Sequence, residues 1–275
     1  MMPHLLTVAR LEWVAAARLK WIRLLTAAFA LMAAAAAYSA GAANELSGAD
    51  GFARTTMALV PVVLMLAPLA AAILGTSGQV AEPGCEPFLF GQPVGRATVV
   101  IGRWLGESAA LASTIVVGLG LGGAIVAFSV GFDGLPQFAF FVAASVMLAA
   151  IFLSLAAAIA AVTAKRLVAL GAGLFAWFLF VLLYDGAALS LAGWMTGPGG
   201  GRVLFASVFA NPVDLVRVVT LSIAGTPHVL GAAGDAWVRF LGGPGAASAT
   251  AAAALVAWLI VPLAVAVRVM RARDL

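Results

Sequence analysis

The hydrophobic positions of this chain form six long, nearly unbroken runs separated by shorter polar segments. An α-helix needs about 20 apolar residues to cross roughly 30 Å of hydrocarbon. The pattern therefore predicts six membrane-spanning helices, over residues 24–43, 56–74, 109–130, 138–163, 167–190 and 249–267. Lys165 and Arg166 separate the fourth run from the fifth. Two adjacent cations are costly in a bilayer centre, so they indicate a turn at the membrane surface.

The composition supports this interpretation. Of the 275 residues, 64% are hydrophobic and only 9% are charged, whereas a soluble domain carries about 25% charged residues. One globular core cannot bury so many apolar side chains, so lipid must cover much of the surface. We predict an all-α, polytopic membrane protein in which residues 1–275 form a single transmembrane domain.

Lysine and arginine predict the orientation, because they are enriched in cytoplasmic loops. Of the 15 such residues, four fall on one side of the predicted spans: Arg54, Arg202, Arg217 and Arg239. The remainder fall on the other side, which we expect to be the cytoplasm. An even number of spans then places both termini there.

Residues 1–23 predict an amphipathic interfacial helix on the cytoplasmic surface. One side of its helical wheel is apolar and the other is polar, although Leu5, Leu6, Trp13 and Arg18 break the pattern. Trp13 and Trp21 suit the headgroup layer. The expected apolar side holds Val8, Leu11, Val14, Leu19, Trp21 and Ile22, and the expected polar side holds Arg10, Glu12, Lys20 and Arg23.

Two loops exceed the length of a turn. The first, residues 75–108, is expected in the cytoplasm and surrounds the short apolar core Phe88-Leu89-Phe90. The second, residues 191–248, is expected outside the cytoplasm. It is too apolar for a disordered linker and too interrupted for a span, so we predict re-entrant short helices at or in the outer leaflet. Irregular backbone at that depth needs cover from protein or a water-filled cavity.

The cytoplasmic loop has the chemistry of a docking element for a soluble partner. Aromatic and aliphatic anchors with a polar rim are typical of protein interfaces. The alternative is a loop that folds against its own helix ends. The candidate docking residues are Glu82, Phe88, Leu89, Phe90, Pro93 and Arg96.

The same loop resembles the coupling helix of ABC-2 type transporter permeases, which reads Glu-x-Gly-Thr-Leu, a Leu-rich turn and then Pro-Val-Ser-Arg. The residues that fit this pattern in order are Glu82, Gly84, Phe88, Leu89, Phe90, Gln92, Pro93, Val94 and Arg96; Cys85, Glu86, Pro87 and Gly95 depart from it. The resemblance implies a homodimer of this chain with separate ATPase subunits that bind ATP and Mg²⁺. It also implies that this loop docks the ATPase.

Shorter stretches resemble the NosY-type permeases that serve the maturation of nitrous oxide reductase. They are Phe52-Ala53-Arg54-Thr55-Thr56 with Pro68-Leu69, and Asn211-Pro212-Val213-Asp214-Leu215-Val216-Arg217. This resemblance implies a role in assembling the copper sites of the reductase, with a periplasmic accessory protein. Two alternatives stay open: a generic ABC-2 exporter of a lipid, glycan or drug-like molecule, and an intramembrane enzyme or scaffold without an ATPase.

The segment from Asn211 to Arg217 has two interpretations. Asn before Pro at the first helical position, with an acid three residues on, is a helix N-terminus signature. Capping alone explains Asn211, Pro212 and Asp214. In the functional interpretation, Asn211, Asp214 and Arg217 line an outer gate or contact a periplasmic partner, because charge is rare on so apolar a segment.

Several motifs are missing from the sequence. It contains no G-x-x-x-x-G-K-[ST], so any ATP hydrolysis belongs to a partner chain. It contains no H-E-x-x-H or G-x-S-x-G either. One cysteine and two distant histidines make a metal site improbable, and we expect no cofactor, metal or catalytic residue in this chain. Gly118 and Gly122 form a G-x-x-x-G that predicts close helix packing within the chain, and Pro61 and Pro68 predict a kinked second span.

Overall fold

The computed structural model describes residues 2–41, 48–79, 95–163, 165–195, 199–223 and 244–272, and all regular structure in these ranges is helical. The predicted all-α, polytopic fold is confirmed. Within the described ranges, six helical segments are long and apolar enough to cross a membrane, and a bent pair, Gly199–Ala210 with Pro212–Ile223, would be a seventh if it were one span. The elements are α1 (Met2–Arg18), α2 (Lys20–Gly41), α3 (Gly48–Gln79), α5 (Arg96–Val130), α6 (Leu135–Val162), α7 (Arg166–Phe178), the π-helical turn η1 (Leu179–Leu183), α8 (Tyr184–Gly193), α9 (Gly199–Ala210), α10 (Pro212–Ile223) and α12 (Pro244–Ala272).

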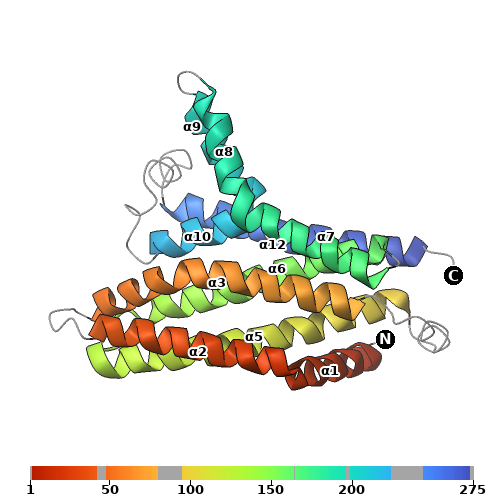
Figure 1. Ribbon diagram of the computed structural model, residues 1–275, viewed down its shortest axis with the longest axis horizontal. Coiled ribbons are helices and arrows are strands. Elements are labelled where there is room, and N and C mark those ends of the chain that lie inside the picture. Colours follow the sequence, from red (N-terminus) through yellow and green to blue (C-terminus); the bar gives the residue numbers. More distant parts are fainter. Residues whose placement is uncertain are drawn as a thin grey trace.

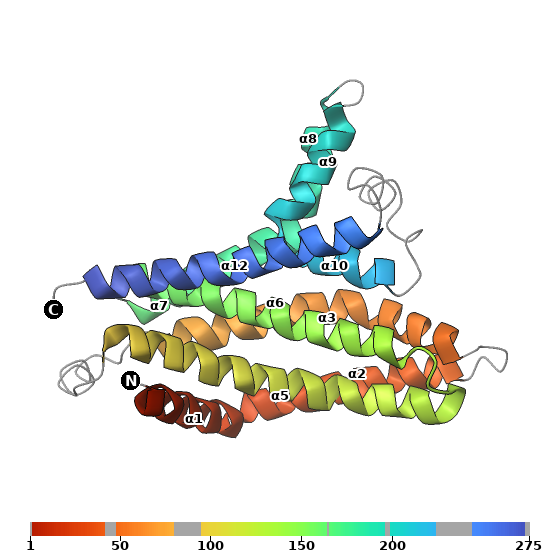
Figure 2. The same ribbon diagram turned by 180° about the vertical axis from the view of Figure 1, so that it is seen from behind.

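The long helices α2, α3, α5, α6, α7 and α12 lie side by side in a bundle (Figures 1 and 2). α1 begins at the same end of the bundle at which α12 finishes, and we call this the terminal end. The predicted turn at Lys165 and Arg166 lies there too, since α6 ends at Val162 and Arg166 begins α7. The second, third and sixth predicted spans lie within α3, α5 and α12, and the fifth lies within the continuous segment from α7 to α8. The first and fourth coincide with α2 up to Gly41 and with α6 up to Val162.

Two helices extend well beyond the predicted spans. α3 continues to Gln79 and α5 already begins at Arg96, so the ends of the 75–108 segment are helical rather than looped. Arg103 and Glu107 lie in this extension of α5 and are both helical. The reason for the difference is that hydropathy marks where a helix enters hydrocarbon, whereas a helix itself continues readily through charged residues.

A stripe of small residues on α5 receives both N-terminal helices. The stripe repeats every fourth residue, which places its members on one helix face, and all are buried: Gly102, Gly106, Ala110, Thr114, Gly118 and Gly122. A Cβ at Gly118 would lie 2.6 Å from the Cβ of Phe29, and one at Gly122 would meet Ala33. Because both contacts are with α2, the prediction that this G-x-x-x-G serves packing within the chain is confirmed.

α1 packs on the other half of this stripe, with a face that differs from the predicted one. A Cβ at Gly102 would lie 2.8 Å from Val8, and one at Gly106 would meet Ala9 and Glu12. Leu11 and Val14, predicted on the apolar side, are exposed. The two faces differ because close approach to α5 selects small side chains, while Leu11 and Val14 of the predicted apolar side lie on the outside of the bundle. Leu19, Trp21 and Ile22 of that predicted side lie beyond α1, which ends at Arg18.

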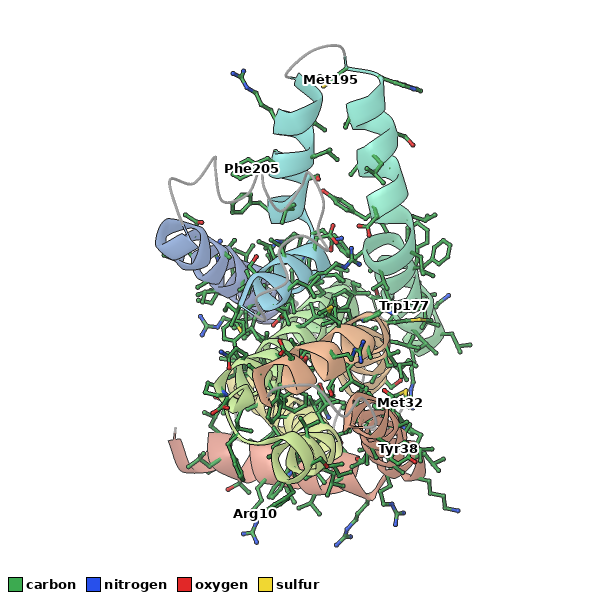
Figure 3. The ribbon with its side chains drawn as sticks, turned by 90° about the vertical axis from the view of Figure 1, so that its left-hand side faces the viewer. Arg10, Met32, Tyr38, Trp177, Met195 and Phe205 are labelled. Atoms are coloured by element: carbon green, nitrogen blue, oxygen red, sulfur yellow. The ribbon has the colours of Figure 1, made fainter. Side chains whose placement is uncertain are left out.

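α3 runs without a break through Pro61 and Pro68. Pro68 has no N–H for the carbonyl of Leu64 one turn earlier. At the next peptide, the Trp177 indole on α7 donates a hydrogen bond to the carbonyl of Met65 over 3.0 Å. Trp177 lies at the join of the bundle and the segment that leaves it (Figure 3). The proline thus lies beside a polar tie between α3 and α7.

Candidate functional site

The segment after α7 leaves the bundle and returns as a hairpin. η1 and α8 turn away from the other helices, and α9 comes back beside α8 (Figures 1 and 2). α10 then bends by 102° from α9 and lies on α6. Short helices within 191–248 are thus present as predicted; their position at the outer leaflet stays a prediction. We call α8 and α9 the arm.

Asn211 holds the bend between α9 and α10 and is fully buried. Its Oδ1 accepts a hydrogen bond from the backbone N–H of Val213 over 3.0 Å, which is the predicted helix cap. Its Nδ2 donates to the carbonyl of Phe180 in η1 over 2.9 Å. A π-helical turn widens the helix and displaces carbonyls from their usual partners. The Asn211 side chain therefore forms hydrogen bonds with backbone groups both at the start of α10 and in the π-helical turn η1.

Arg217 joins two acids that come from different elements. Its Nη1 lies 2.8 Å from Oδ1 of Asp214 and 2.7 Å from Oδ2 of Asp185 on α8. Asp214 Oδ2 in turn accepts from Asn211 Nδ2 over 3.1 Å. Burying charges in a low dielectric is costly unless they are paired and hydrogen-bonded. The network meets this requirement, and it fastens α10 to the base of the arm.

Two further side chains donate hydrogen bonds to carbonyls near the end of α9, next to the bend. Tyr184 on α8 donates through its hydroxyl to the carbonyl of Ser207 over 2.9 Å. The Trp258 indole on α12 donates to the carbonyl of Phe209 over 3.0 Å. The last carbonyls of a helix have no partner in the helix itself. Lipid cannot provide one, so these bonds allow α9 to end inside the molecule.

A cavity of about 380 Å³ lies between α3, the base of the arm and α10. Asp185 and Arg217 provide its polar groups, and apolar side chains form the rest of its wall: Met57, Val60, Pro61, Leu64, Met65, Val181, Leu182 and Leu221. The α3 part of its wall, Met57 to Met65, lies in the middle of that helix. The rest of the wall comes from the base of the arm and from α10, which lies toward the end of the bundle opposite the terminal end (Figure 1). A cavity with polar and apolar walls beside a bent helix pair is suited to binding a ligand or to movement of the two helices. Among the residues that the structure describes, no group of three His, Cys, Asp or Glu side chains gathers as in a metal site.

The structure brings Asn211, Asp214 and Arg217 together and adds residues that the sequence analysis missed. Asp185 and Tyr184 complete the cluster from α8. An isolated acid within an apolar span is itself a signal of function, so Asp185 could have been singled out. Tyr184 gave no such signal, because its role depends on where the bend places Ser207.

Most candidate docking residues lie outside the described part of the chain. These are Glu82, Phe88, Leu89, Phe90 and Pro93. Arg96 is described: it is the first residue of α5 and is partly buried. Gly95 before it accepts backbone hydrogen bonds from Thr98 and Val99. The segment that follows α3 therefore leads directly into the helix that carries the small-residue stripe.

Comparison with known proteins gives a match over nearly the whole chain. The family model described as "ABC-2 family transporter protein" matches residues 6–275. The "Probable ABC transporter permease protein NosY" of Pseudomonas aeruginosa is 31% identical over 227 residues, covering 80% of this chain and 82% of that protein. The protein of the same name from Stutzerimonas stutzeri is 29% identical over 221 residues, covering 78% of this chain and 80% of its own length.

Proposed function

Because the chain belongs to the ABC-2 family of transporter permeases, we propose that it couples ATP hydrolysis in a separate ATPase subunit to a transport or maturation step at the opposite end of the bundle. The observation that carries this proposal is the family match over residues 6–275. A cavity lined by α3, the base of the arm and α10, and by no residue at the end of α3 or the start of α5, adds to it. ATP and Mg²⁺ belong to the partner. The functional unit is a homodimer of this chain with two ATPase chains in a bacterial inner membrane, and both termini are cytoplasmic.

The helix arrangement supports a mechanical route. In the sequence, the proposed docking residues Glu82, Phe88, Leu89, Phe90 and Pro93 fall between the end of α3 and the start of α5, and Arg96 is the first residue of α5. α5 packs against α1, α2, α3, α6 and α12. α3 also lines the cavity that contains Asp185 and Arg217. A push on the docking segment is therefore delivered to the helix that forms the cavity wall.

Asn211, Asp214 and Arg217 are proposed to set the position of the arm at this far site, either as an outer gate or as support for a periplasmic partner. The bend is held by side-chain bonds rather than by a continuous helix. If these side-chain bonds change partners together, the arm takes a second position. An element with two such positions is what a switching transition requires.

The specific role that we favour is assembly of the copper sites of nitrous oxide reductase. The support is the name NosY that both relatives carry, together with the short stretches that resemble NosY-type permeases. A deletion strain should then produce reductase with a low copper content, restored by the wild-type gene. Fully metallated reductase in the deletion strain would refute this role and leave the alternative of a lipid, glycan or drug exporter, for which amphiphiles would stimulate the ATPase in liposomes.

The coupling proposal is tested by purifying the tagged chain in mild detergent and identifying the proteins that accompany it. Phe88→Asp with Leu89→Asp should remove the ATPase from the complex. The matched control is Phe132→Asp with Leu135→Asp, two exposed apolar residues at the opposite end, which should retain it. If no ATPase accompanies the wild-type chain in several detergents, the coupling proposal fails, and a scaffold or enzyme without an ATPase becomes the better interpretation.

A further inference from the structure

The outward face of α1 mixes exposed apolar and cationic side chains. Leu6 and Leu11 are 66% and 65% exposed, and Trp13 is 44% exposed. Arg10 and Arg18 are exposed on the same helix. Water does not favour this much exposed apolar surface, and the hydrocarbon core does not accept the arginines. The layer that suits both is the lipid headgroup region, where apolar side chains reach inward and cations meet phosphates.

The positive charge on this face has no compensating acid nearby in sequence. Glu12 is the one acidic residue among residues 1–23, against Arg10, Arg18, Lys20 and Arg23. Glu12 faces inward and its Oε1 lies 3.1 Å from Nε of Arg103 on α5. All four cations are exposed. The face therefore presents an excess of positive charge, which complements an anionic surface.

The direction of this charge distinguishes lipid from a soluble partner. Seen along the bundle, Arg10 points sideways, away from the other helices (Figure 3). An ATPase docked where α3 ends and α5 begins would lie beyond the terminal end, whereas lipid headgroups surround the bundle at its side. We infer that the outward face of α1 and the start of α2 bind the headgroups of anionic phospholipids.

The same helix is fixed firmly to the transport domain. α1 is seated on Gly102 and Gly106 and tied by the Glu12–Arg103 ion pair. Lipid bound to α1 therefore stabilises the arrangement of α1 on α5, which lies directly after the docking segment. Anionic lipid raises the melting temperature of the permease and acts at the end where the ATPase is proposed to bind.

The test uses the permease alone, so its outcome does not depend on the proposed ATPase. Native mass spectrometry of the detergent-solubilised chain measures binding of phosphatidylglycerol and of phosphatidylcholine. We expect tighter binding of phosphatidylglycerol. One cation at an anionic surface contributes about fivefold in affinity, so Arg10→Gln with Arg18→Gln should lose roughly 25-fold. Arg10→Lys with Arg18→Lys should retain the preference for phosphatidylglycerol.

The matched control removes two exposed cations from the same end of the bundle but from α12, as Arg268→Gln with Arg271→Gln. This control should keep the affinity for phosphatidylglycerol. Equal binding of the two lipids by the wild-type chain would overturn the inference, as would unchanged binding by the α1 variant. If the α1 variant kept its lipid but lost a copurifying ATPase, the face would be a protein-docking surface and the inference would be wrong.

Discussion

Asp185 Oδ2 lies 2.7 Å from Arg217 Nη1, although the two residues are 32 positions apart. Asp185 lies on α8, the first helix of the arm, and Arg217 lies on α10, which follows the arm. The contact exists only because α9 and α10 meet at a 102° bend. The ion pair therefore forms only when the arm has this position relative to the bundle. Removing one of its partners is the most direct way to disturb that position.

A double-mutant cycle on this pair measures its contribution. Arg217→Gln removes the cation and leaves the carboxylates of Asp185 and Asp214 without it, so we expect a lower free energy of unfolding than in the wild type. Asp185→Asn in the same chain should recover part of this loss. Both side chains are partly exposed, so we expect a coupling energy of about 1 kcal/mol, read from unfolding in mixed detergent micelles.

Strict additivity of the two single changes would contradict a contribution from the ion pair. The exposed Arg202 on α9 provides the control. Arg202→Gln should leave the unfolding midpoint unchanged.

Asn211 should be among the least replaceable polar residues of the fold. Asn211→Ala removes the acceptor for the Val213 N–H and the donor for the Phe180 carbonyl, and we expect a loss of about 1–3 kcal/mol. Asn211→Ser retains a good capping oxygen but cannot span to Phe180, so its loss should be smaller. The order wild type, Ser, Ala in the free energy of unfolding checks this account. Equal losses for Ser and Ala would assign the whole effect to the contact with η1.

Two glycines of α5 provide a matched pair for the packing of α2. A Cβ at Gly122 would meet Ala33, whereas a Cβ at Gly120 would meet nothing within 4 Å. We expect Gly122→Ala to lower the free energy of unfolding by about 1–3 kcal/mol through overpacking. Gly120→Ala should be neutral or stabilise the helix by up to about 1 kcal/mol. Thermal melts of the purified chain separate the two, and a stable Gly122→Ala variant would show that α2 can move away without cost.

A substitution at the glycines of α5 that contact α1 should also disturb packing, but only locally. A Cβ at Gly106 would meet the carbonyl of Ala9 and the side chain of Glu12. Gly106→Ala should therefore loosen α1 while the rest of the bundle stays folded. Hydrogen exchange of residues 5–13 should accelerate, with α6 unchanged. Gly171→Ala, at a position with open space around it, should leave exchange in α1 as in the wild type.

The parts of the fold that could be predicted from the sequence are those set by local pattern. Hydropathy located all six spans, and the Asn211-Pro212 pair located the start of α10 and its cap. The inward face of α1 was not predictable, because it depends on Gly102 and Gly106, more than 80 positions later. Asp185 stood out as an acid in an apolar span, but its pairing with Arg217 was not predictable, because only the bend between α9 and α10 brings the two residues together.

The stripe of small residues on α5 has a consequence for exchanging parts between related permeases. Residues 2–41 pack closely on α5 because the α5 side chains at these contacts are small or absent. α1, α2 and α5 (Arg96–Val130) therefore form one structural module. A chimaera that takes α1 and α2 from a relative with bulkier residues at 102, 106, 118 or 122 should misassemble. A chimaera that transfers both segments together carries its own complementary surface, and it should insert and fold as a unit.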